Sequence, residues 1–81
     1  MTPKQIELAR HALGLPNKTR KSCRNHFVTG EGSSDHPDWM AMLDAGDARR
    51  WPPTQLTGGD DLFRLTKQGA MAALMPLEKL G

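Results

Sequence analysis

The chain has few of the residues that cross-link a fold or supply large aromatic side chains to its core. Its 81 residues include one cysteine, no tyrosine, two tryptophans and two phenylalanines. A single cysteine excludes an internal disulfide and favours a reducing, cytoplasmic setting. The longest apolar run, Ala70–Met75, is far shorter than the roughly 20 residues of a membrane span, and Met1–Lys4 lacks a signal peptide's apolar core. We therefore expect one small domain over residues 1–81 that has no membrane partner.

Charge is distributed unevenly along the chain. Residues 1–30 carry six Lys or Arg and one acid, a net charge of +5, whereas residues 31–81 carry five Lys or Arg and eight acids, a net charge of −3. The formal total of +2 hides this polarity. An excess of cations in the first half indicates an anionic partner facing it, although it does not define a fold.

The first helix is predicted by its ends. Thr2 suits the N-cap position, Gln5 stands at capping-box spacing from it, and Pro3 fits the first helical position. Gly14 permits the left-handed conformation that ends a helix. The sequence therefore predicts a helix over residues 3–13.

Short strands and two further helices are expected downstream. Composition typical of strands marks residues 25–29, 48–51 and 62–65. Helices are expected to start near Asp35, which is placed to cap the first of them, and at Thr66. The last helix is expected to run to Pro76 and to pack through a narrow stripe formed by Ala70, Ala73, Leu74 and Leu77. The predicted fold is α+β and winged-helix-like: three helices with a small antiparallel sheet of two or three strands.

The second half resembles the wing region of winged-helix transcription regulators of the MarR and PadR kinds. In those proteins a helix ends in a turn with Leu and Gly, and a hairpin follows. The hairpin closes on a strand that reads roughly aromatic-x-Leu-Thr-x-x-Gly before a further helix. The corresponding residues here are Leu43, Gly46, Phe63, Leu65, Thr66 and Gly69. The resemblance covers residues 39–75 and implies a wing-like hairpin.

One feature departs from that pattern. A winged helix-turn-helix inserts its second helix into the DNA major groove. Here the helix expected near residues 37–45 would present Asp38, Asp44 and Asp47 to the phosphates. Because carboxylates and phosphates repel each other, we do not expect this helix to enter a groove or to read a specific DNA sequence.

The whole chain also resembles small uncharacterised proteins encoded by tailed phages and prophages. The likeness lies in the first helix, Leu8–Leu15, in the segment Arg24–Phe27, and in Gly58–Phe63. It covers most of the chain, and it implies a phage-type protein without implying an activity.

A basic segment is the main candidate site. Four cations fall within seven residues and alternate with hydrogen-bonding side chains; they are Lys18, Arg20, Lys21 and Arg24. Such a segment can contact several phosphates and so bind nucleic acid without reading its sequence. Arg49 and Arg50 would extend this surface if the fold places them beside the basic segment. An acidic protein partner and a merely solvated loop are the alternatives.

The patterns that suggest metal binding or catalysis are weak. Cys23, His26, His36 and Asp38 resemble zinc ligands, but structural zinc sites are usually richer in cysteine. The adjacent residues 33–36, Ser-Ser-Asp-His, contain the letters of a hydrolase triad, yet triads assemble from distant, rigid segments. We therefore expect no cofactor, no metal and no enzymatic activity.

The two tryptophans are interpreted differently. Trp39 shares a helix face with Leu43 and is assigned to the core. Trp51 is either an exposed contact residue or a core residue that shields the hairpin; the scarcity of large apolar residues favours the core, while exposure would mark a partner contact.

The favoured function is a non-enzymatic, phage-type binding module that contacts the nucleic-acid backbone through the basic segment. The alternative is a protein–protein interaction module that dimerises or docks on a host or phage protein, with Trp51 as the contact.

Overall fold

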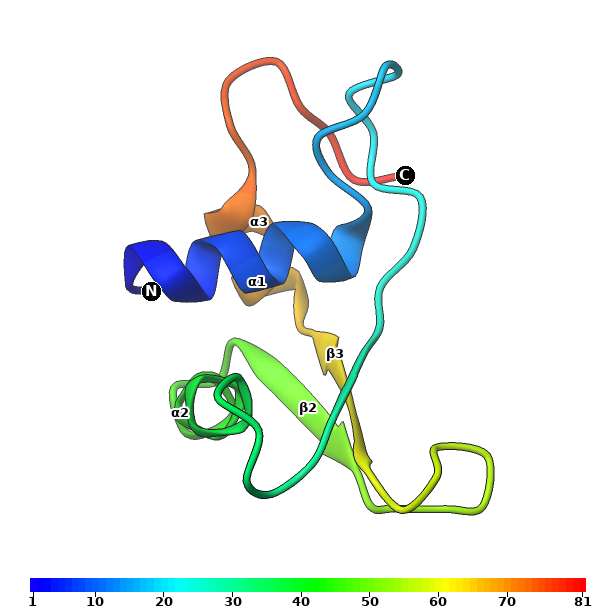
Figure 1. Cartoon of the computed structure of the whole chain (residues 1–81). Coiled ribbons are helices and arrows are strands. Elements are labelled where there is room, and N and C mark those ends of the chain that lie inside the picture. The colour runs from blue at the N-terminus through cyan, green and yellow to red at the C-terminus, as the bar shows by residue number, and fades with distance from the viewer.

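The computed structural model describes all residues, 1–81, as three helices and three strands (Figure 1). In chain order they are α1 (Pro3–Leu13), β1 (Phe27–Thr29), α2 (His36–Asp44), β2 (Ala48–Trp51), β3 (Asp61–Leu65) and α3 (Lys67–Ala73). The strands form one antiparallel sheet in the order β1-β3-β2. The predicted α+β class, with three helices and a small antiparallel sheet, is confirmed. The likeness of the second half to a winged helix stays a prediction.

The core lies on one face of this sheet. The Trp39 ring of α2 stacks on Phe63, with ring centroids 5.4 Å apart, and lies 5.1 Å from Phe27. Trp39 is fully buried, so its assignment to the core is confirmed. α1 and α3 pack side by side and close the core opposite the sheet (Figure 1). The smaller core side chains are Ala9, Ala12, Leu13, Leu15, Met42, Ala48, Leu65, Ala70 and Ala73.

Local capping residues fix the bounds of α1. The Thr2 hydroxyl accepts a hydrogen bond from the Gln5 amide at 3.1 Å, and the Gln5 side chain accepts one from the Thr2 amide at 3.0 Å. Gly14 takes the left-handed conformation at the other end, with φ of 75°. Both features are readable from sequence, and the helix predicted over residues 3–13 is confirmed.

Two element ends and one helix cap differ from expectation. β1 begins at Phe27 rather than residue 25, because the Asn25 side-chain amide pairs with the Leu65 backbone at 2.8 and 3.0 Å. α2 begins at His36, as expected, but the Asp35 side chain makes no capping hydrogen bond, so the predicted cap was wrong.

The third difference lies at the end of α3. The helix stops at Ala73, where the carbonyl accepts a hydrogen bond from the Arg10 guanidinium at 3.0 Å. Leu74 is already extended, and Pro76 has no N–H with which to continue the helix. The expected stripe is therefore correct for Ala70 and Ala73 and wrong for Leu77, which is 77% exposed.

The Thr-x-x-Gly part of the wing-like motif has a packing role. The Thr66 hydroxyl accepts from the Gly69 amide at 3.2 Å and donates to the Gly46 carbonyl at 2.8 Å. A Cβ atom on Gly69 would lie 2.0 Å from the carbonyl oxygen of Asp47. α3 can therefore approach the start of β2 only because residue 69 has no side chain.

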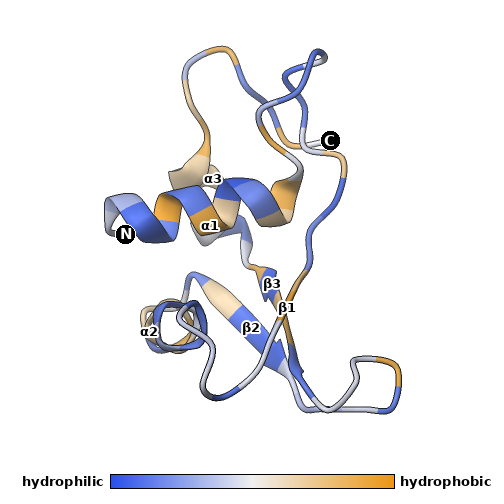
Figure 2. Cartoon of the chain, in the orientation of Figure 1, coloured by the Kyte–Doolittle hydropathy of each residue, from blue (hydrophilic) through white to orange (hydrophobic).

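The long connection from α1 to β1 is mostly hydrophilic, and it runs beside the C-terminal segment (Figures 1 and 2). A parallel bridge joins Lys21 to Lys79, with backbone hydrogen bonds from Ser22 to Lys79 at 2.9 Å and from Lys79 to Arg20 at 2.8 Å. No helix of the molecule has the length and apolar character needed to cross a bilayer.

Candidate nucleic-acid interface

The basic loop, residues 17–24, is held in shape by Asn17. Its amide nitrogen donates to the carbonyls of Gly14 at 3.0 Å and Lys21 at 2.7 Å, and its oxygen accepts from the backbone and hydroxyl of Thr19. The C-terminal segment supports the loop from the other side through the Lys21–Lys79 bridge. The loop is therefore an ordered platform from which its cations project.

None of the four predicted loop cations forms an ion pair. Lys18, Arg20 and Lys21 are exposed and form no ion pair. Arg24 differs, because its guanidinium donates to the His11 carbonyl at 2.8 and 3.2 Å and so caps the last turn of α1. It remains exposed, with its charge uncompensated.

The sheet face turned away from the core, here called the outer face, carries two further free cations. It consists of Val28, Arg49, Trp51, Leu62 and Arg64, as the alternation along each strand and the strand register require. Arg49 lies directly opposite Arg64, and the Arg64 guanidinium carbon lies 5.2 Å from the Trp51 ring centroid. Trp51 is 42% exposed, so the interpretation of it as a core residue was wrong.

Arg50 does not share that face. As the neighbour of Arg49 on the strand it points to the other side, where its guanidinium donates to Asp61 at 3.0 Å. Asp61 is buried and also lies 2.8 Å from the His36 ring. The Arg50 guanidinium, with His36, lowers the pKa of the Asp61 carboxyl. This cluster joins the start of α2 to the sheet. Because Asp61 compensates the positive charge of Arg50, that charge is not free to contact a phosphate, as predicted for Arg50.

Two hollows extend from the basic loop toward the sheet, and one of them reaches the outer face. One, of about 350 Å³, is lined by Arg24 and Lys67 and reaches the end of β3 at Leu65 and Thr66. The other, of about 280 Å³, is lined by His11, Arg24, His26, Phe27 and Val28, and so reaches the outer face at Val28. Arg24 lines both hollows and links the loop to the sheet.

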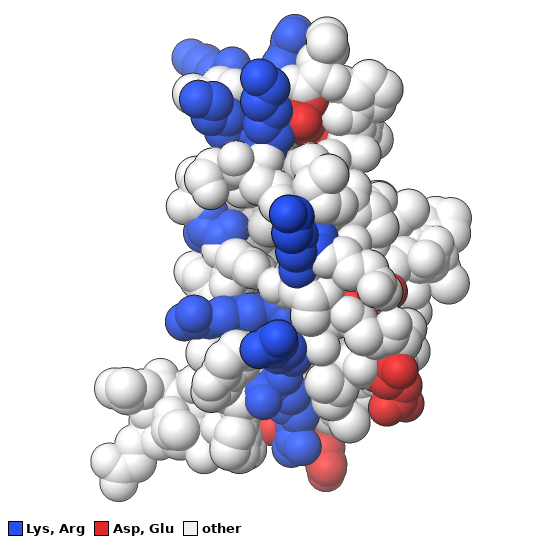
Figure 3. Space-filling view, turned by 180° about the vertical axis from the view of Figure 1, so that it is seen from behind, with Lys and Arg blue, Asp and Glu red and all other residues white.

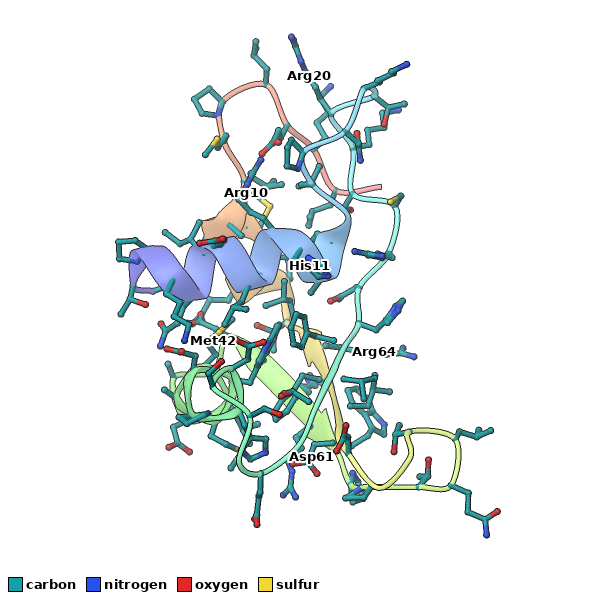
Figure 4. All side chains as sticks on the ribbon, in the orientation of Figure 1. Arg10, His11, Arg20, Met42, Asp61 and Arg64 are labelled. Carbon is teal, nitrogen blue, oxygen red and sulfur yellow. The ribbon has the colours of Figure 1, made fainter.

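A space-filling view shows the result (Figure 3). Lys and Arg atoms gather in a band from the end of the molecule that bears the basic loop down to the sheet, and acidic atoms lie mainly at the lower right and at the bottom of the view, with one acidic group beside the basic atoms at the top. In the stick view, Arg20 lies at one end of the molecule, Arg64 points outward from the sheet, and Asp61 lies at the other end (Figure 4). Arg50, bonded to Asp61, is therefore remote from the basic loop.

Sequence reasoning missed three cations of this band. They are Arg64 on the outer face, Lys67 in the first hollow and Lys79 beside the loop. Side chains alternate between the two faces along β3, so Arg64 lies on the opposite face from Phe63 and Leu65. This alternation could have been read from the sequence. The positions of Lys67 and Lys79 depend on tertiary contacts that leave no local pattern.

The residues of the two weak patterns, those of zinc ligands and of a hydrolase triad, have other surroundings in the structure. The structure contains no group of three or more His, Cys, Asp and Glu side chains that could hold a metal ion, so Cys23, His26, His36 and Asp38 do not converge. His36 pairs with Asp61 rather than with its neighbour Asp35, and that pair stabilises the packing of α2. In comparisons with known proteins, no family model, curated protein or solved structure matches this chain.

Proposed function

We propose that this protein is a non-enzymatic binding module, of the kind that tailed phages encode, which contacts the backbone of nucleic acid. The observation that carries the proposal is the ordered basic loop, where Lys18, Arg20 and Lys21 are exposed and form no ion pair. Arg24, Lys67, Arg49 and Arg64 continue the positive charge toward the sheet. Arg50 is left out, because Asp61 already compensates its charge.

The physical basis is counterion release. Each phosphate that a cation neutralises frees condensed counterions, so the affinity falls steeply as salt rises. A loop already held by Asn17 loses little conformational entropy on binding, which favours its cations over those on disordered segments. Backbone contacts of this kind bind without reading sequence.

The test is a salt series on mixed-sequence DNA and RNA with matched variants. Lys18→Gln and Lys4→Gln make the same chemical change, but Lys4 is paired with Asp38 at 3.1 Å whereas Lys18 has no partner. Lys18→Gln should weaken binding and lower the salt slope by about 0.9 on duplex DNA, and Lys4→Gln should change neither. Failure of the wild type to form any complex at low salt would refute the proposal.

A protein-interaction module is the second candidate, supported by exposed apolar side chains. Met71, Met75 and Leu77 are each more than half exposed, and Met75 lines a largely apolar hollow of about 520 Å³ beside α1. This function predicts self-association or partner binding that is insensitive to salt and visible by sedimentation. Loss of that association in Trp51→Ala or Met71→Ala would support it, and a monomer at all concentrations would weaken it.

A further inference from the structure

The outer face presents the only exposed aromatic side chain among four Trp and Phe residues. Trp39 stacks on Phe63 and packs against Phe27 on the core side of the sheet, while Trp51 is 42% exposed on the other side. Val28, on the same face, is 43% exposed. In a chain with so few large apolar residues, an indole that is 42% exposed gives up a large part of the burial that would stabilise the fold.

The charges on this face are all of one sign. Arg49 and Arg64 lie directly opposite each other on neighbouring strands, an arrangement of like charges that destabilises a sheet. No acidic residue lies on the outer face, since its other members are Val28, Trp51 and Leu62. An anion placed between the two guanidinium groups would offset this repulsion, so the face is complementary to a polyanion.

The geometry around Trp51 fits an anion that also carries a flat apolar group. The Arg64 guanidinium lies over one face of the Trp51 ring, 5.2 Å from its centroid, so a base would stack on the ring face that this phosphate-binding charge leaves uncovered. The hollow lined by His11, Arg24 and His26 joins this face at Val28 and leads toward the basic loop. Cation, aromatic ring and groove thus occur in the combination typical of single-strand binding.

We propose that the outer face is a stacking platform for single-stranded nucleic acid, in which a base stacks on Trp51 while Arg49 and Arg64 bind the flanking phosphates. This inference rests on the proposed function and specifies its ligand as unpaired rather than duplex. Bases in a duplex are stacked on one another and cannot reach a ring on a sheet. α2 offers no groove-reading alternative, since Asp38 is on its first turn and Asp44 at its end.

The experiment uses the intrinsic fluorescence of the two tryptophans. An oligothymidylate of about 12 nucleotides falls within the range of sites on small single-strand-binding folds, and a duplex of equal length is the comparison. The single strand should quench the wild-type emission. Trp51→Phe leaves only the buried Trp39 as reporter and should abolish that quenching while keeping a ring for stacking.

Measured affinities of variants for the single strand distinguish the contribution of stacking from that of charge. Trp51→Ala should weaken single-strand binding by roughly 5- to 100-fold, because a base–aromatic stack is lost. The salt slope should stay unchanged, because the substitution removes no phosphate contact. Arg64→Gln should lower the single-strand salt slope by about 0.7. Met71→Ala is the matched control: it truncates an apolar side chain that is 53% exposed on α3, and it should not change the affinity.

The outcomes distinguish this inference from the proposed function. If duplex binds as tightly as single strand, or if Trp51→Ala binds as well as wild type, the stacking platform is refuted and backbone binding stands. If poly-L-glutamate displaces the oligonucleotide at equal charge concentration, the platform is also refuted, and an acidic protein becomes the indicated partner. If neither nucleic acid binds at low salt, both proposals fail together.

Discussion

The eleven Lys and Arg side chains divide by whether an acid lies within reach. Lys4, Arg10 and Arg50 form ion pairs, and the other eight form none. The most enclosed pair joins Arg10 to Glu78, with side chains 10% and 8% exposed. Arg10 also donates to the Ala73 carbonyl, so one guanidinium fastens the C-terminal segment to α1. Cations in such ion pairs stabilise the fold. The unpaired Lys and Arg side chains are therefore the ones that can bind an anionic ligand.

The Arg10–Glu78 pair makes stability depend on pH. The Arg10 guanidinium lowers the pKa of Glu78 from 4.5 to about 2, helped by the Met75 amide. Because the folded-state pKa is depressed, this stabilisation is complete above the unfolded value and is lost as pH falls from 4.5 toward about 2. We expect Glu78→Gln to unfold at lower urea concentration than wild type at pH 7, and the two proteins to converge near pH 2.

The control for that series is Glu7→Gln. Glu7 is exposed and makes no ion pair, so its substitution should leave urea midpoints close to those of wild type at every pH. A wild-type advantage over Glu78→Gln that stays constant from pH 2 to 7 would contradict the assignment of the shift to Glu78.

Among the elements, those with local signals were predicted well. α1 follows from Thr2, Gln5 and Gly14, which act within a few residues of one another. The start of β1 and the end of α3 were not predictable, because they depend on Asn25 bonding to Leu65 and Arg10 bonding to Ala73 across the fold. The candidate site divides in the same way. The basic loop is visible as a charge run. Alternation along the predicted strand separates Arg49 from Arg50, but only the fold shows that Arg50 is the one that meets Asp61.

The cap of α3 provides a test at the scale of the element. The Thr66 hydroxyl both caps the helix and donates to the Gly46 carbonyl, whereas the Thr2 hydroxyl only caps α1. Thr66→Ala should therefore lower the free energy of unfolding by about 2 kcal/mol and Thr2→Ala by about 1 kcal/mol, measured by urea denaturation. Thr66→Ser keeps the hydroxyl and should recover most of the loss. Equal losses in Ser and Ala variants would show that the methyl group, not the hydroxyl, matters.

The basic loop can be tested without changing its charge. Asn17→Ala removes the side-chain hydrogen bonds to Gly14, Thr19 and Lys21, so the loop must then be ordered on binding. Each kcal/mol of added ordering cost weakens affinity about 5-fold. We expect weaker binding to oligonucleotide with the same salt slope as wild type, because the phosphate contacts are unchanged. A reduced slope would mean that Asn17 places a cation directly rather than ordering the loop.

At the scale of the whole molecule, the charges are arranged along its length. The longest extent is 36 Å, and the basic band follows it from the loop to the sheet (Figure 3). Acids of the second half hold Lys4 and Arg10 of the first half, through Asp38 and Glu78. The polarity seen in the sequence is therefore only partly neutralised within the fold, and the unpaired remainder repels itself in the native state.

A polyanion bound to this band should therefore stabilise the fold itself. A ligand that binds only the native state at 100 times its Kd adds about 2.7 kcal/mol, which in a domain of this size raises Tm by roughly 10–20 °C. We expect such a shift with oligothymidylate at low salt, followed by calorimetry. The triple variant Lys18→Gln, Arg20→Gln, Lys21→Gln should lose most of it, and Lys4→Gln should retain it. Added salt alone should give a smaller rise, because screening relieves repulsion without making contacts. If salt and oligonucleotide raise Tm equally, the band is merely a repulsive surface and binds no ligand.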